Sequence, residues 1–141
     1  MSSRALAVLG VVAGCAIGER RLVAPANDRA TVLLVTGGLG RPIEAIARHP
    51  WFAVRAAGAT EWTIWEVGGG GTSDDPFDNE PYVEPILHGV WRGAEAEAAI
   101  ACLAEAAPVW LEALDYRVWP GPNSNTFGDV MLRRCGLRAS L

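Results

Sequence analysis

Hydrophobic positions occur first as short apolar runs and later in the chain as longer helical patterns. Residues 31–36 (TVLLVT) form an uninterrupted, β-branched run that two glycines close, which is typical of a buried strand. Three further strands are predicted at residues 51–55 (WFAVR), 61–67 (EWTIWEV) and 86–91 (ILHGVW). The chain therefore begins its folded part with β-structure.

Helical patterns follow these strands. Residues 94–114 are rich in Ala, Glu and Leu, and Pro108 within them either kinks one helix or begins a second. Residues 124–135 predict a last helix, and residues 42–48 allow a helical turn or two. Strands followed by helices predict an α+β fold, in which a small, mostly antiparallel sheet packs with two or three helices.

The strand predicted at residues 61–67 alternates between two faces. One set of side chains is Trp62, Ile64 and Glu66, and the other is Thr63, Trp65 and Val67. Glu66 is thus expected to share a face with large apolar side chains.

A glycine-rich surface loop then continues to about Tyr82. Its acidic residues are Asp74, Asp75, Asp78 and Glu80. Their irregular spacing favours a solvated loop over a calcium site, and no metal site is predicted.

The N-terminus has the pattern of an export signal. Arg4 precedes an uncharged apolar run at residues 5–13, which is too short to span a bilayer but suits a signal peptide. The run ends in Val-Ala-Gly-Cys, which resembles a bacterial lipobox with Cys15 as the lipidated residue. We therefore expect a signal segment at 1–15, a tether at 16–30 and one α+β domain at 31–141, anchored to the cell envelope. The alternative is a buried first strand or helix in a cytoplasmic protein.

The composition of the chain restricts the classes of molecule that it could bind. Half of the residues are apolar, so that one domain can bury a core, and the net charge is −4. The twelve basic residues are scattered arginines, which excludes a basic stripe for nucleic acid. The expected partner is the membrane, through the lipid anchor.

Cys102 and Cys135 lie in helical stretches and are predicted to be unpaired thiols, although an oxidising envelope would permit a disulfide.

The glycines after the first strand do not predict a cofactor. The segment VLLVTGGLG resembles the start of a dinucleotide-binding fold, but it lacks the third glycine, and Arg41-Pro42 occupies the turn. No repeated βαβ pattern follows. A plain glycine turn explains the segment better, and we expect no cofactor.

Residues 116–127 (YRVWPGPNSNTF) carry the most specific pattern in the chain. An extended piece meets a rigid Pro-Gly-Pro corner, and a helix begins at Asn123 or Ser124. A side chain at that position feels the positive end of the helix dipole, which suits a nucleophile. Ser124 or Asn125 equally suits a helix cap. Both interpretations of Ser124 remain open.

Three segments together resemble a known family. The segment GPNSNTF, with HPWFAV at residues 49–54 and WTIWEV at residues 62–67, resembles a bacterial family of uncharacterised proteins over residues 31–135. More distantly, the order of these segments is similar to circularly permuted papain-like folds, which include NlpC/P60 and lecithin:retinol acyltransferase-like proteins. That similarity implies His49 as base, Glu66 as its orienting residue and Ser124 as nucleophile, where those families have Cys. The implied binding residues are Asn123, Asn125, Thr126 and Trp119.

Three functions follow from this pattern. The first is a non-catalytic binding module whose papain-like cleft holds a peptide, glycan or acyl ligand, because the expected Cys is absent. The second is an amide or ester hydrolase or acyltransferase that uses Ser124 and His49. The third is a structural component of the cell envelope. The other histidine, His88, is expected to be a half-buried strand residue, and most of the six tryptophans are expected in the core.

Overall fold

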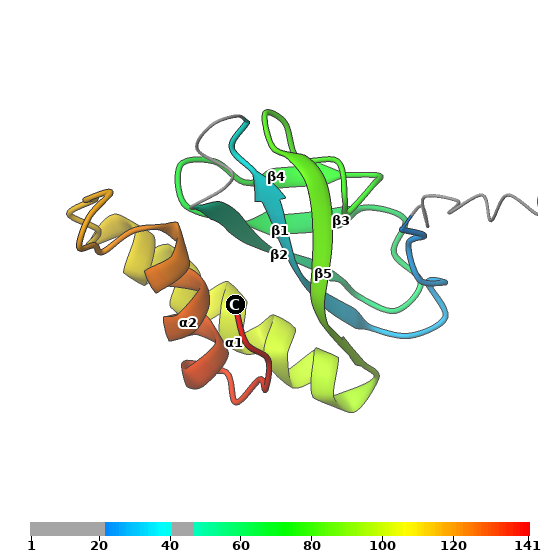
Figure 1. Ribbon diagram of the computed structural model, residues 1–141. Helices are drawn as coiled ribbons and strands as arrows, with labels where there is room; N and C mark the ends of the chain where they lie inside the picture. Colours follow the sequence, from blue (N-terminus) through cyan, green and yellow to red (C-terminus); the bar gives the residue numbers. More distant parts are fainter. Residues whose placement is uncertain (1–21, 41–46) are drawn as a thin grey trace, which may run out of the picture.

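A five-stranded antiparallel sheet packs against two helices in the computed structural model, which describes residues 22–40 and 47–141 (Figure 1). The strands are β1 (Thr31–Gly38), β2 (Arg48–Arg55), β3 (Trp62–Trp65), β4 (Gly71–Ser73) and β5 (Val83–Arg92). Their order in the sheet is β4-β3-β2-β1-β5, and every neighbouring pair is antiparallel. The helices are α1 (Ala94–Glu112) and α2 (Ser124–Arg134). The predicted α+β class is confirmed.

All four predicted strands are present, and the differences lie around glycine and proline. The short β4 was not predicted, because the glycines at 68–71 and the Asp74-Asp75-Pro76 turn that follows gave no strand pattern. Helix α1 continues through Pro108, which is exposed, so no second helix begins there. The helical turn predicted at residues 42–48 falls mostly outside the described residues, although Arg48 itself begins β2.

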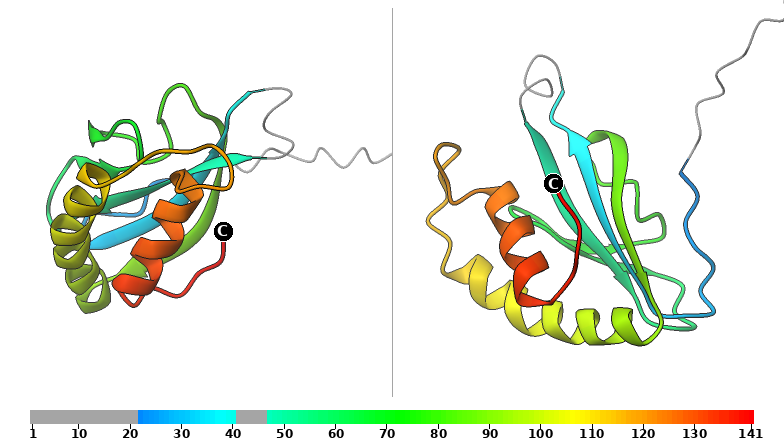
Figure 2. Two further views of the ribbon diagram at one scale, coloured as in Figure 1. Left: turned by 90° about the vertical axis from the view of Figure 1, so that its left-hand side faces the viewer. Right: turned by 60° about the horizontal axis from the view of Figure 1, so that its bottom comes forward.

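The sheet buries side chains on both of its faces, which explains the uninterrupted apolar run of β1. The helix face carries Val32, Leu34, Phe52, Val54 and Trp91, which pack with α1 and α2. The opposite face carries Leu33, Val35, Trp51, Trp62 and Ile64. Both views of Figure 2 show the helices together on one side of the sheet. Each large apolar side chain buried in this way contributes about 1.5–3 kcal/mol.

Residues 74–82 cover the opposite face and are more than the surface loop that the sequence predicted. Phe77 packs into the core of that face, and the Trp51 indole donates a hydrogen bond of 3.0 Å to the Pro76 carbonyl. Leu22 and Ala24 add cover from the N-terminal side. The loop is thereby fixed over the sheet, although its acidic residues remain exposed.

A disulfide joins the two helices, so the prediction of two unpaired thiols was wrong. It links Cys102 of α1 to Cys135, the residue that caps the end of α2, across a Cα–Cα distance of 5.6 Å. The sequence pattern placed each cysteine on a helix but not the two helices side by side. Within the described residues, neither helix combines the length and the hydropathy that a bilayer crossing requires.

Candidate functional site

His49 and Glu66 meet at one end of the sheet. His49 lies near the start of β2, opposite Gly37 of β1, and Glu66 directly follows β3. The ring Nε2 of His49 lies 2.8 Å from Oε2 of Glu66, and the two residues are only 5% and 6% exposed. When Nε2–H donates to the ionised carboxylate, Nδ1 keeps its lone pair and remains an acceptor. The structure thus brings together two residues that the sequence proposed as a pair.

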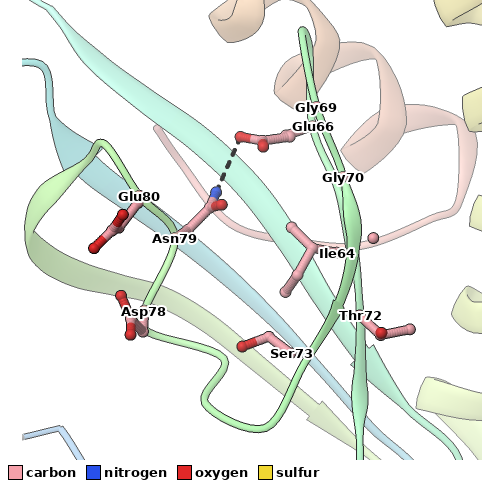
Figure 3. Close-up of a pocket in the computed structure, with 10 residues that line it drawn as sticks. Ile64, Glu66, Gly69, Gly70, Thr72, Ser73, Asp78, Asn79 and Glu80 are labelled. Carbon is pink, nitrogen blue, oxygen red and sulfur yellow. Dashed lines mark hydrogen bonds between the residues drawn. The ribbon is translucent and has the colours of Figure 1, made fainter.

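Two residues of the covering loop hold this pair in place. The side-chain amide of Asn79 donates a second hydrogen bond, of 3.0 Å, to Oε2 of Glu66, as Figure 3 shows. The ring of Tyr82 lies parallel to the His49 ring, with centroids 4.0 Å apart and an interplanar angle of 4°. Burial, and then the charge of Glu66, raise the pKa of the Tyr82 phenol. No pattern in the sequence pointed to either residue, because both lie in a segment that looks like a solvated loop.

Two glycines make room for these contacts. A Cβ at Gly37 would lie 2.6 Å from Cβ of Tyr82, and a Cβ at Gly69 would lie 2.6 Å from Oε1 of Glu66. Real Cβ atoms do not approach that closely, so any side chain at either position displaces its neighbour. The sequence predicted a glycine turn here. In the structure Gly37 lies within β1 instead.

Helix α2 places Ser124 at its first position and uses other residues as its cap. The side-chain oxygen of Asn123 accepts from the Thr126 backbone N–H at 3.2 Å, and the Thr126 hydroxyl accepts from the Asn123 backbone N–H at 3.2 Å. This capping box makes the alternative of Ser124 or Asn125 as cap wrong. Ser124 is 8% exposed, and its hydroxyl forms no hydrogen bond with any side chain or backbone group that the structure describes.

His49 and Ser124 line one pocket of about 390 Å³. The other lining residues are Leu39, Val67, Gly68, Tyr82, Leu114 and Tyr116. Across the described part of the chain, no hydrogen bond connects the Ser124 hydroxyl directly to the His49 ring. The backbone N–H groups of Ser124 and Asn125 belong to the first turn of α2, whose donors have no partner within the helix. The pocket therefore combines a hydroxyl, an imidazole and the positive end of a helix.

The other residues proposed for binding lie outside that pocket. Asn125 lines two neighbouring pockets, and Thr126 lines one of these. Trp119 is 87% exposed on the loop before α2. His88, half-buried on β5 as predicted, lies 2.9 Å from the Thr36 hydroxyl through its Nε2. The geometry thus separates the His49 pocket from the second histidine.

An acidic pocket lies on the other side of Glu66. It has a volume of about 420 Å³, and Figure 3 shows Asp78 and Glu80 on the covering loop, across from the strands that carry Ile64 and Thr72. Glu66 both lines this pocket and contacts His49. In residues 22–40 and 47–141 no three His, Cys, Asp or Glu side chains come together to hold a metal ion.

The fold and this site define a small α+β domain with a buried His–Glu pair beside a serine-lined pocket. Residues 30–141 match the family described as protein of unknown function (DUF3750), and the chain belongs to that family. The prediction of an uncharacterised family is confirmed. No significant match was found among curated proteins or among solved structures.

Proposed function

We propose that this protein is a serine-dependent hydrolase or acyltransferase that acts on ester or amide bonds. The observation that carries the proposal is the shared pocket: Ser124 does not cap α2, and it lines the same pocket as His49. Glu66 holds Nε2 of that histidine at 2.8 Å. A nucleophile, a base and a group that orients the base are the parts that acyl transfer requires.

The reaction has two balanced steps. The Ser124 oxygen attacks the substrate carbonyl carbon while its proton passes to Nδ1 of His49, and the positive ring is stabilised by Glu66. The bond to the leaving alcohol or amine then breaks as His49 returns the proton to it. Water or an acceptor alcohol attacks the resulting acyl-serine with the same proton transfers in reverse order, and the serine is regenerated.

The start of α2 supports this chemistry electrostatically. The backbone N–H groups of Ser124 and Asn125, together with the helix dipole, favour negative charge next to the attacking oxygen. Removing a single donor of this kind from an enzyme typically lowers kcat by about 10²–10³. A serine hydroxyl gains little nucleophilicity from a dipole alone, which is why the base at His49 is essential to the proposal.

The resemblance to permuted papain-like folds supports the same roles. In this chain, as in those folds, a histidine on a strand, an orienting residue after the next strand and a nucleophile at a helix start follow one another. The serine replaces the cysteine of those folds, so the proposed enzyme depends on general base catalysis and not on a preformed thiolate.

A non-catalytic binding module is the second candidate. The observation in its favour is that no hydrogen bond joins the Ser124 hydroxyl to the His49 ring in the described structure. Catalytic hydrogen bonds are often long in unliganded enzymes and tighten with substrate, so this observation does not exclude catalysis. The same pocket would then hold its ligand without reaction.

Covalent labelling separates the two candidates. The wild-type protein, Ser124→Ala and His49→Ala are incubated with an alkyl fluorophosphonate, and adducts are measured by intact mass and located by peptide mapping. Catalytic function predicts one adduct on Ser124 that is absent from Ser124→Ala and at least about 10² times slower to form in His49→Ala. A folded wild-type protein that acquires no adduct would leave the binding module as the better description.

We also propose that the protein is exported and anchored to the cell envelope through Cys15, which lies outside the described residues. The signal-like N-terminus and the disulfide between Cys102 and Cys135 support this location, because disulfides persist in oxidising compartments. The full chain is expected to partition into detergent and to lose this property in Cys15→Ser. A wild-type chain that stays in the aqueous phase contradicts the anchor.

A further inference from the structure

We propose that the pocket of Ser124 and His49 receives an uncharged, apolar acyl group, and that the substrates are esters or amides of hydrophobic acids. This inference rests on the proposed function and specifies its substrate class. It concerns which acids the site accepts and not whether the serine reacts, so the two are tested separately below.

The described residues that line the pocket are mostly apolar or aromatic. Apart from His49 and Ser124, it consists of Leu39, Val67, Gly68, Tyr82, Leu114 and Tyr116. None of these is an acid, a lysine or an arginine. A charged group that entered this space would lose its water without meeting an acidic, lysine or arginine side chain as a partner, and that loss is costly. An alkyl group would instead bury apolar surface at a gain.

The neighbouring pockets differ in this respect. Glu66, Asp78 and Glu80 line the acidic pocket on the far side of the His–Glu pair. Asp129 lines the pocket beside α2, and Arg48 lines the pocket next to His88. Counting only lining residues that the structure describes, the pocket that holds the candidate nucleophile is thus the one of these four without a carboxylate or guanidinium.

The loop between α1 and α2 extends the apolar surface beyond the pocket. Tyr116 lines the pocket and is also 51% exposed, and Val118 and Trp119 follow it with 76% and 87% exposure. This loop is closed by hydrogen bonds from the Arg117 backbone to Pro122, at 2.9 Å, and from the Asn123 side chain to Val118, at 3.0 Å. Adjacent large apolar side chains that remain in solvent are typical of binding surfaces. We assign Trp119 to the binding of acyl chains too long for the pocket.

A chain-length series tests the assignment. The substrates are p-nitrophenyl acetate, butanoate, hexanoate and octanoate, and the anionic monoester of glutaric acid, with kcat/KM measured for the wild type against Ser124→Ala. Each methylene that the pocket buries is expected to raise kcat/KM about fourfold, and the anionic ester is expected to react more slowly than butanoate. A Ser124-dependent activity with a flat or falling series, or with a preference for the anionic ester, overturns the inference.

Two variants show whether the named side chains cause the preference. Tyr116→Asp places a charge in the exposed part of the lining and is expected to lower the octanoate-to-acetate ratio by about tenfold. Val109→Asp is the matched control, because Val109 is 61% exposed on α1 and does not line the pocket. Trp119→Ala is expected to lower the octanoate-to-acetate ratio of kcat/KM. Equal ratios in the wild type and Tyr116→Asp contradict the assignment.

Binding to Ser124→Ala keeps the inference separate from catalysis. Calorimetry compares N-methylacetamide, N-methyloctanamide and the glutaric acid mono-methylamide on this variant, which cannot form an acyl-serine. Tighter binding of the octanamide supports the apolar pocket even if the wild type never reacts with an ester or a phosphonate, in which case only the proposed catalysis fails. Binding that does not distinguish the three amides overturns the inference, even if labelling at Ser124 succeeds.

Discussion

The two histidines of this chain lie on neighbouring parts of one sheet and have different partners. His49 on β2 contacts a buried carboxylate, Glu66, at 2.8 Å and borders the pocket of Ser124. His88 on β5 contacts a hydroxyl, Thr36, at 2.9 Å, and that hydroxyl also accepts a hydrogen bond of 3.2 Å from Arg48. A carboxylate stabilises the positive ring that forms when histidine takes a proton, whereas a hydroxyl next to a guanidinium gives no such support.

This difference assigns a role to each histidine from its surroundings rather than from its residue type. The His49 ring is held on one nitrogen by Glu66 and on one face by Tyr82, so its orientation is fixed while its other nitrogen remains available. The contact of His88 satisfies a half-buried polar group and links β5 to β1. The comparison can be broken or sharpened by changes at the His49 site, and the first three are set against a matched change elsewhere.

Removing each ring has the largest expected effect. His49→Ala is expected to lower kcat/KM for a reactive ester by about 10²–10⁴, because general base catalysis is lost. His88→Ala is expected to change it by less than about threefold, because that ring does not line the pocket of Ser124. Initial rates on p-nitrophenyl butanoate measure both variants, and circular dichroism verifies their folds. Equal losses in the two variants would remove the basis for the comparison.

Changing the partner of each histidine has the next largest effect. Glu66→Gln keeps the size of the side chain but removes its charge, and we expect kcat to fall by about 10²-fold or more. Thr36→Val removes the hydroxyl that His88 contacts, and we expect about 1 kcal/mol less stability with nearly unchanged kcat. Steady-state kinetics and urea unfolding separate the two effects. A Glu66→Gln variant with wild-type kcat would reduce Glu66 to a structural residue.

Local patterns in the sequence predicted much of the fold. The features that were not predicted depend on contacts between residues far apart in the chain. The β-branched run at residues 31–36 and the alternation at 61–67 identify buried strands, because both signals come from neighbouring residues. The sequence also placed His49 at a strand start and Glu66 on the next strand, although Glu66 directly follows β3 in the structure. The roles of Asn79 and Tyr82 were not, because they depend on residues 74–82 folding back over the sheet. The disulfide was missed for the same reason.

Filling the space beside Glu66 is the third prediction. A Cβ at Gly69 would lie 2.6 Å from Oε1 of Glu66, so Gly69→Ala must displace that carboxylate. We expect a loss of about 1–3 kcal/mol in stability and a lower kcat, because the carboxylate no longer aligns with His49. Gly58→Ala is the control for a glycine replacement that displaces no neighbour, since no atom lies within 4 Å of a Cβ there. Its positive φ of 78° means that alanine also lowers stability at this position. A loss of kcat confined to Gly69→Ala supports the role of Glu66, whereas unchanged kcat contradicts it.

The smallest expected effect concerns the phenol that covers His49. Burial and the charge of Glu66 raise the pKa of Tyr82 above its ordinary value, so the native state holds this proton more tightly than the unfolded chain. The resulting stability is fully present below pH 10, the approximate pKa of an unfolded tyrosine, and is lost as the pH rises through the native value. Tyr82→Phe keeps the stacked ring but has no proton to lose. The difference in unfolding free energy between wild type and Tyr82→Phe, measured at pH 8 and pH 11, should therefore shift against the wild type at the higher pH. A constant difference would mean that the phenol titrates alike in the folded and unfolded chains, and that Tyr82 acts on His49 through ring contact alone.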